Sequence, residues 1–357
     1  MLPTTRPMIL PTLLPMRRPT MRQARLRFFL AARLALAICL TLGACLALSG
    51  CVQANVSLFG EPGKPYKEQV LDGKGPDKLL LLGIDGLISD HTRQGLLRTR
   101  PSTVQELVAQ LKLARKDTSI KAVVLKIDSP GGTTIASDIL YHELMTYKEA
   151  SKIKLVAAMM GLAASGGYYV ALPADHIMAH PTTITGSVGV IFLQPRVAGL
   201  MEKLGVGVDV SKSGTLKDMG SPFRAATEEE KKIVNAMTRA QATRFLELVQ
   251  LHRRLEPAAL GIVASARVFG AAEAKDLGLI DSVGYLDDAL ATAKSLAGLP
   301  KDATVVTYRR QPAADGTYYL PGVEAEGNRP TVINLDLDGL LPPQAGMYYL
   351  WTPAYGQ

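Results

Sequence analysis

The chain has 357 residues, enough for one large or two ordinary domains, and a formal net charge of +8. Seven arginines and no acidic residue fall within residues 1–50, which leaves a net charge of +1 for the rest of the chain. The basic balance therefore belongs to the N-terminal segment and does not indicate a nucleic-acid partner. All three cysteines lie within the first 51 residues, so the body of the chain has no disulfide, thiolate nucleophile or cysteine metal site.

Residues 1–51 have the features of an export leader. An arginine-rich stretch precedes the apolar run 34–50, which is at the lower limit for spanning a bilayer. The run ends in Leu48-Ser-Gly-Cys51, which resembles a lipobox, the signal after which a bacterial lipoprotein is cleaved and acylated on its new N-terminal cysteine. We expect lipidation of Cys51 or, without cleavage, a single membrane anchor. Either way, the body is expected at the membrane, outside the cytoplasm. Met21 is an alternative start, because residues 1–20 add nothing that a signal requires.

The composition then changes. Residues 52–77 contain several Gly, Pro and Lys residues without periodicity and are interpreted as a linker. The folded domain is expected to span residues 78–298. Its first half predicts apolar strands at 79–84, 122–127 and 153–159, and helices at 103–116 and 137–150. Short apolar strands that alternate with helices predict an α/β fold with a largely parallel sheet covered on both faces.

The second half of the domain is mainly helical. A strand is expected at 206–210, and Thr227-Glu-Glu-Glu230 is a capping box that predicts a helix start. The helices predicted here span 197–204, 227–254, 271–277 and 286–296. Residues 299–357 are interpreted as a C-terminal extension with one strand candidate at 331–335.

A candidate nucleophile lies at the end of the third strand. Ser165 is the centre of Gly161-Leu-Ala-Ala-Ser-Gly-Gly-Tyr-Tyr-Val-Ala171, between the strand and the opening turns of a helix. Such a junction exposes a hydroxyl at the end of the sheet, and the two following glycines leave room for a substrate backbone. The same stretch is also compatible with a serine that only caps the helix.

A glycine turn follows the neighbouring strand, as Asp128-Ser-Pro-Gly-Gly132. Ligands bind at the carboxyl ends of the strands in open α/β sheets. Gly131 and Gly132 can direct their N–H groups towards one point, as an oxyanion hole requires. An ordinary Pro-Gly turn has the same sequence.

If Ser165 is a nucleophile, we expect a lysine to be the base that activates it. The five histidines have no zinc-binding spacing, and none has a setting that suggests a Ser-His-Asp triad. Desolvation can lower the pKa of a lysine amine by several units and so provide a neutral base. Lys212 and Lys217 lie in the polar segment 211–222, where a lysine taken alone is more often a solvated surface charge than a catalyst.

Four segments in chain order, Asp128-Ser-Pro-Gly-Gly132, Ala164-Ser-Gly-Gly-Tyr-Tyr169, Thr185-Gly-Ser-Val-Gly189 and Ser213-Gly-Thr-Leu-Lys-Asp218, closely resemble the bacterial signal peptide peptidase A family. The resemblance covers roughly residues 78–298 and implies a crotonase-like or Clp-protease-like fold. It implies Ser165 as nucleophile, Lys217 as general base, Ser187 as the serine that hydrogen-bonds the lysine, and Gly131 and Gly132 as the oxyanion hole. No cofactor or metal is implied.

The resemblance further implies apolar peptide substrates, above all signal peptides left in the membrane after cleavage, and a homo-oligomer whose neighbouring subunits complete each site. Three other functions stay open: a stomatin-associated type of membrane serine protease, a crotonase-like acyl-CoA enzyme and a non-enzymatic lipoprotein scaffold. An exported leader argues against the acyl-CoA enzyme, because CoA is cytoplasmic.

Overall fold

The computed structural model describes residues 65–94, 99–310, 317–319 and 346–354. Among them is a nine-stranded sheet with the order β1-β13-β2-β5-β7-β8-β12, in which β9 also pairs with β7, and β11 with β9. Its strands are β1 (Lys67–Asp72), β2 (Lys78–Asp85), β5 (Ile120–Ser129), β7 (Lys154–Ala164), β8 (His176–Ala179), β9 (Ile184–Gly186), β11 (Val268–Gly270), β12 (Ser282–Val283) and β13 (Thr304–Arg309). All pairs except β1–β13 and β9–β11 are parallel.

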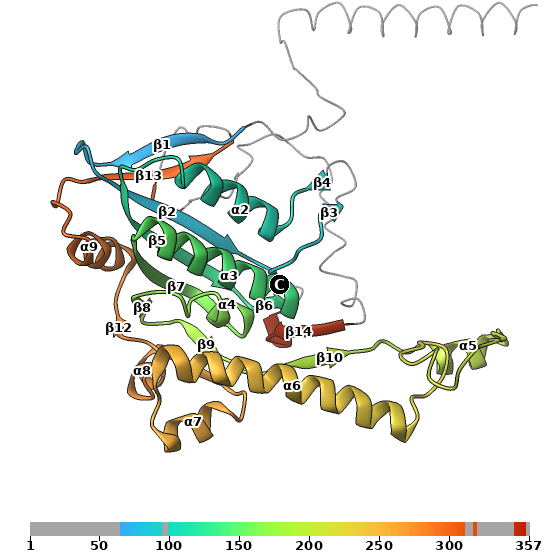
Figure 1. Ribbon diagram of the computed structural model, residues 1–357. Helices are drawn as coiled ribbons and strands as arrows, with labels where there is room; N and C mark the ends of the chain where they lie inside the picture. Colours follow the sequence, from blue (N-terminus) through green and yellow to red (C-terminus); the bar gives the residue numbers. More distant parts are fainter. Residues whose placement is uncertain (1–64, 95–98, 311–316, 320–345, 355–357) are drawn as a thin grey trace, which may run out of the picture. The chain divides into compact units, whose positions relative to one another are not determined.

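Helices cover both faces of this sheet (Figure 1). They are α2 (Thr103–Ala114), α3 (Thr134–Ser151), α4 (Gly166–Tyr169), α5 (Ala198–Leu204), α6 (Glu228–Arg253), α7 (Pro257–Val263), α8 (Ala271–Asp276) and α9 (Leu286–Leu296), with a short 3-10 helix η2 (Thr352–Ala354). Ser102 and Thr227 begin α2 and α6 with capping boxes, so the helix start expected at Thr227 is confirmed.

The continuous apolar strands arise because both faces are buried. Successive side chains of a strand point to opposite faces. Leu80 and Leu82 of β2 therefore join the core beneath α2 and α3, whereas Leu79 and Leu81 join the core beneath α9. The α/β fold with a largely parallel sheet is as the sequence predicts.

Both segments that flank the expected domain contribute strands to its sheet. β1 lies within 52–77, the segment interpreted as a linker, and β13 lies within the extension 299–357. β1 is an edge strand with four exposed or half-exposed polar positions and no apolar run, which is why periodicity did not reveal it. The strand candidate at 331–335 and the leader with Cys51 lie outside the described residues.

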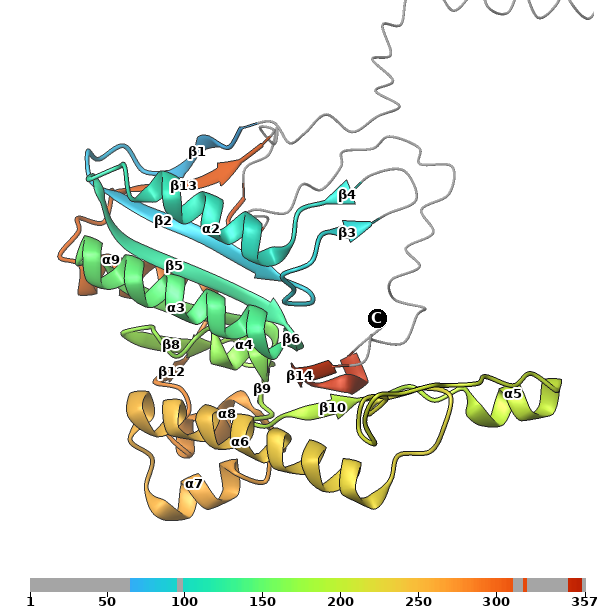
Figure 2. The same cartoon turned by 45° about the vertical axis from the view of Figure 1, so that its right-hand side comes forward.

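Two smaller sheets complete the fold. β6 (Gly131–Thr133), β14 (Gly346–Leu350) and β10 (Ile191–Leu193) form an antiparallel sheet with β14 in the middle (Figure 2). β3 (Arg93–Gln94) pairs with β4 (Thr99–Arg100). The first of these sheets joins the chain's C-terminal strand to the turn that follows β5.

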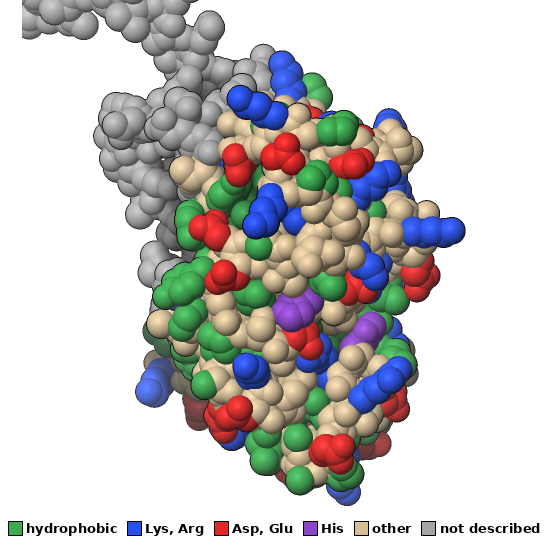
Figure 3. Space-filling model, turned by 90° about the vertical axis from the view of Figure 1, so that its left-hand side faces the viewer, with side chains coloured by type: hydrophobic (Ala, Val, Ile, Leu, Met, Phe, Trp, Pro, Cys, Tyr) green, Lys and Arg blue, Asp and Glu red, His purple; other side chains and the backbone are tan. Residues whose placement is uncertain are grey.

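Residues 194–226, which we call the arm, connect β10 to α6 and carry α5 away from the main sheet (Figures 1 and 2). The strand expected at 206–210 is wrong, since no strand is assigned there in the arm. Its apolar side chains are exposed, for example Leu200 by 59% and Leu204 by 68%. The face shown in Figure 3 instead carries interspersed acidic and basic side chains. Clustered exposed apolar side chains are typical of an interaction surface.

Candidate active site

Ser165 is the best candidate nucleophile by geometry. It follows β7 directly, and its backbone has φ 53° and ψ −113°, an unusual conformation for a residue other than glycine. Such strain costs on the order of 1–3 kcal/mol and occurs preferentially at functional sites. Ser165 occupies the N-cap position of α4, but its side chain makes no capping hydrogen bond, so capping does not account for the serine.

The Ser165 hydroxyl is buried and has no hydrogen-bond partner among the described residues. Buried polar atoms are nearly always paired, so an exception calls for an explanation. A nucleophilic serine would have such an unpaired hydroxyl if its base came from another subunit.

The glycine turn lies against Ser165, as expected. A Cβ on Gly131 would lie 2.7 Å from the Gly166 nitrogen, and one on Gly132 would lie 1.8 Å from the Ile88 oxygen. Neither position therefore has room for a side chain. The Gly131 N–H donates to Ser129 Oγ at 3.1 Å. Gly132 lies opposite Tyr349 in the β6–β14 ladder, and the Trp351–Pro130 bond two positions along makes this a hydrogen-bonded pair. Both N–H groups therefore have partners, and the partner of Gly132 lies on β14.

Gly166 is a donor that the sequence analysis missed. It is the first residue of α4, where a backbone N–H has no partner inside the helix. In hydrolases with a strand-turn-helix nucleophile, the residue after the serine supplies one oxyanion N–H, and this rule could have identified Gly166 from the sequence.

Ser187 lies on the other side of the candidate nucleophile. The Ser165 N–H donates to the Gly186 oxygen at 2.8 Å, and the Ser187 N–H donates to the Arg267 oxygen at 2.9 Å. Ser187 has a positive φ of 50° and is buried. The structure thus brings Gly131, Gly132 and the 186–187 turn around Ser165.

β14 covers this group of residues. Tyr349 lies opposite Gly132, and the Trp351 N–H donates to the Pro130 oxygen at 2.9 Å. The Tyr349 ring stacks on Tyr169 with centroids 4.9 Å apart. An extended backbone therefore fits antiparallel between β6 and β10, directly beside Ser165.

Lys217 is not brought to Ser165 within the subunit. It lies in the arm and is exposed, whereas Ser165 directly precedes α4. The arm extends away from α4 (Figures 1 and 2). Lys217 Nζ has no hydrogen bond or ion pair in the described part of the chain. Lys212 Nζ, by contrast, pairs with Asp218 Oδ1 at 2.8 Å, so Lys217 is the lysine of the two that is available.

An ionic cluster fixes the loop beside Lys217. Arg224 binds both Asp218 and Glu230, and Glu230 also closes the capping box of α6. The Arg224 guanidinium lowers the pKa of Glu230 to about 2, and together with Lys212 it lowers the pKa of Asp218. The carboxylates therefore stay ionised at neutral and mildly acidic pH, and the loop stays attached to α6.

Three of the five histidines are engaged elsewhere. His176 bonds Ser282, His180 bonds Thr182, and His252 bonds the Tyr141 hydroxyl. Burial lowers the pKa of His252. No hydrogen bond joins a histidine to Ser165 within the described residues, so the geometry does not favour a Ser-His-Asp triad.

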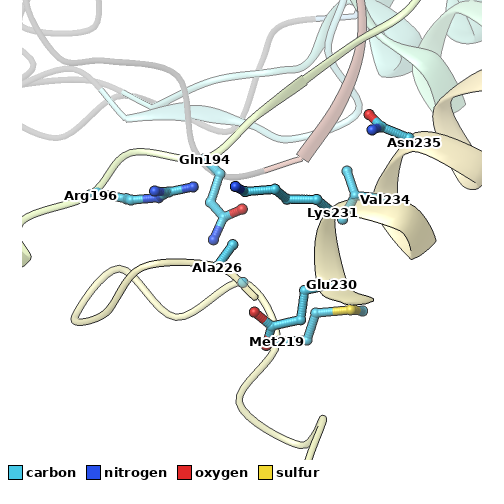
Figure 4. A pocket seen from close by; sticks show the side chains of 9 residues that line it. Gln194, Arg196, Met219, Ala226, Glu230, Lys231, Val234 and Asn235 are labelled. Carbon is cyan, nitrogen blue, oxygen red and sulfur yellow. The ribbon is translucent and has the colours of Figure 1, made fainter. Parts of the chain in front are cut away.

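A cavity of about 260 Å³ lies at the base of the arm, against the first turns of α6 (Figure 4). Arg196 and Lys231 extend towards each other across it, beside Gln194. None of the predicted site residues lines this cavity, so it is separate from the group around Ser165.

The chain matches the model of peptidase family S49 over residues 147–300 and that of Clp protease over residues 98–185. It is 34% identical to an Enterococcus faecium protein provisionally named signal peptide peptidase SppA, over 75% of this chain and 78% of that one. A Synechocystis protein provisionally named protease slr0021 is 36% identical, over 63% of this chain and 76% of that one. Protease 4 of Salmonella typhi is 36% identical over 54% of this chain and 31% of its own length.

Fold and relatives define an α/β serine protease with a Clp-protease-like fold. More narrowly, the chain belongs to peptidase family S49 and is of the signal peptide peptidase A type, as the four sequence segments indicate. Among the helices that the structure describes, none is long and apolar enough to cross a membrane.

Proposed function

We propose that this protein is a membrane-tethered endopeptidase that degrades cleaved signal peptides and other apolar peptides with a Ser-Lys dyad. Ser165 is the nucleophile, and Lys217 of a neighbouring subunit is the general base. One observation carries the proposal: among the described residues, the buried Ser165 hydroxyl has no hydrogen-bond partner, and the exposed Lys217 amine on the arm has none either.

The reaction begins when Ser165 Oγ attacks a peptide carbonyl carbon and its proton passes to the neutral amine of Lys217. The N–H groups of Gly132 and Gly166 donate to the oxyanion as it forms. The lysine ammonium then returns the proton to the leaving amine, and the peptide bond breaks. Water hydrolyses the resulting acyl-enzyme by the same route, and Ser187 Oγ orients the lysine.

The groove for the substrate is the space between β6 and β10. β14 supports this assignment, because it lies there as an extended antiparallel strand with its backbone beside Gly131 and Gly132. A peptide that replaced it would place a carbonyl next to the two oxyanion donors. The buried Ser165 hydroxyl would then be reached from the groove.

Exposed lysine is normally protonated, so Lys217 needs to leave water before it can act as a base. Docking of the apolar arm on a neighbouring subunit would bury it beside Ser165. Cyclic assembly through one repeated heterologous contact provides such an arrangement for every subunit.

The enzymatic proposal is tested by assaying the full chain in detergent on apolar peptides, with Ser165→Ala as the control. We expect peptide cleavage that falls by about 10⁴-fold or more in Ser165→Ala, with unchanged thermal unfolding. If Ser165→Ala still cleaves peptides, Ser165 is not the nucleophile. If the parent protein hydrolyses acyl-CoA but no peptide, a crotonase-like enzyme is favoured instead.

The attachment is a separate part of the proposal. We propose that the leader is cleaved before Cys51 and that this cysteine is diacylated, since two acyl chains anchor a protein stably. Mass spectrometry of the mature N-terminus is expected to find lipid on Cys51. Residues upstream of Cys51 in the mature protein would instead identify an uncleaved anchor.

A further inference from the structure

The strand that carries Ser165 is irregular just before the serine. Along the β5–β7 pair, Ile127 lies opposite Met159, but Ser129 lies opposite Ala163. β7 therefore advances four residues while β5 advances two. Residues 160–162 of β7 thus lie opposite the single residue 128 of β5. They form a bulge with two extra residues, where β7 leaves β8 and begins to pair with β9. The conformation of this bulge determines where Ser165 is placed.

Side chains hold the bulge from two sides. From the β9 side, the buried Thr183 hydroxyl donates to the Met159 oxygen at 3.0 Å and also to the Met160 oxygen. From the β5 side, Asp128 Oδ1 accepts the Leu162 N–H at 2.9 Å. Leu162 is three residues before Ser165. The regular β5–β7 hydrogen bonds are interrupted at the bulge. The side-chain bonds from both sides therefore fix its backbone.

Asp128 differs from Thr183 because it is charged and exposed. It lies beside Asp85 in the β2–β5 register, and Lys126 of the same strand is 3.9 Å from Asp85 and donates to the Tyr319 oxygen. Burial raises the pKa of Asp85, and the charge of Asp128 adds to this rise. Asp128 itself has no ion pair in the described part of the chain. In the described residues, the Asp128 side chain makes one hydrogen bond, which it accepts from the Leu162 N–H. Because the acceptor is a carboxylate, this bond is charge-assisted.

We propose that Asp128 is a positioning residue that holds the β7 bulge, and through it Ser165, in the geometry needed for attack. This inference rests on the proposed role of Ser165. A displacement of about 1 Å at a reacting atom can lower a rate by about 100-fold. The role requires an acceptor oxygen at the position of Oδ1; it does not require a negative charge.

The test compares three variants of the full chain. Asp128→Ala removes the acceptor, Asp128→Asn keeps an acceptor oxygen but loses the charge, and Asp128→Glu keeps the charge but displaces the oxygen. A matched control is Asp175→Ala, because Asp175 Oδ2 accepts the Leu155 N–H at 2.9 Å near the start of the same strand. Readouts are kcat and KM on an apolar peptide, the labelling rate of Ser165 by a fluorophosphonate, and Tm.

We expect Asp128→Ala to lower kcat and the labelling rate by about 10- to 100-fold with KM nearly unchanged. Asp128→Asn should stay within about 3-fold of the parent, and Asp128→Glu should be slower than Asp128→Asn. Asp175→Ala should lower Tm at least as much as Asp128→Ala and leave kcat within about 2-fold.

The inference is overturned if Asp128→Ala retains the parental kcat, or if Asp128→Glu is faster than Asp128→Asn, which would show that charge is what matters. A change confined to KM would also overturn it and indicate a contact with substrate. If Ser165→Ala itself keeps full activity, the proposed function fails instead, and this outcome is separate from all of those above.

Discussion

The two regions that carry the proposed dyad are built differently. The edge of the sheet around Ser165 is buried and held by backbone contacts among β6, β7, β9 and α4. The arm is exposed, carries apolar side chains into solvent, and is attached at its base by the Arg224 cluster. The first region is packed within the subunit, but the Ser165 hydroxyl has no partner among the described residues. The second region exposes Lys217 and apolar side chains to solvent. This difference is the reason for our proposal that the site is assembled from two subunits.

The largest expected effect separates the two lysines of the arm. Lys217→Ala should lower peptide cleavage by about 10⁴-fold, as loss of a dyad member does, with Tm unchanged because the side chain is exposed. Lys212→Ala removes the bonds to Asp218 and to the Thr215 oxygen, but Arg224 still binds Asp218. It should therefore retain most activity. The reverse order in a steady-state assay would make Lys212 the base.

A smaller effect is expected where β14 covers the serine. Tyr349→Ala removes the ring that stacks on Tyr169 and contacts Phe245. This loosens β14, so Ser165 should react with a fluorophosphonate about 10-fold faster. Tyr348→Ala, on the opposite face of the strand, is the comparison. Equal labelling of the parent and both variants would mean that β14 does not limit access.

Arg224→Ala tests whether the ionic cluster at the base of the arm holds the loop that carries Lys217. The substitution leaves Asp218 and Glu230 close together without their shared cation. The loop that carries Lys217 should loosen, activity should fall by about 10-fold, and Tm should change little. Limited proteolysis within 211–226 measures the loosening. An unchanged cleavage rate there would show that the cluster does not hold the loop.

The smallest effect concerns pH. The folded pKa of Glu230 is about 2 and that of Asp218 is also depressed. Groups with depressed pKa values contribute stability that is complete above their unfolded pKa, near 4, and is lost as pH falls through the folded value. Proteolysis of the arm should therefore be the same at pH 7 and pH 5. A rise in arm cleavage between those values would contradict this assignment.

The sequence predicts the main sheet well because the sheet depends on local patterns, and the candidate nucleophile also has a local pattern. Buried strands such as β2 and β5 are continuous apolar runs, and the Ser165 motif combines a strand end with two glycines. β1 was not predicted, because an edge strand needs no apolar run. The error at 206–210 has a related cause: alternating valines resemble a strand, but a strand exists only where it has a partner.

Other features depend on contacts between distant residues and leave no local signal. Asp128 supports Leu162 only because β7 has a bulge opposite it, and no spacing in the sequence indicates that bulge. The Gly131 N–H is occupied by Ser129, which the Pro-Gly motif cannot show. The separation of Ser165 from Lys217 likewise follows from the path of the arm.

The most direct test of a site shared between subunits is to co-fold inactive Ser165→Ala with inactive Lys217→Ala protein. If the dyad spans subunits, about a quarter of the boundaries in a random mixed ring pair an intact Ser165 with an intact Lys217. Peptidase activity should then return to a comparable fraction of the parent value. If the mixture stays as inactive as its two components, each subunit carries its own dyad, and the arm does not supply the base to its neighbour.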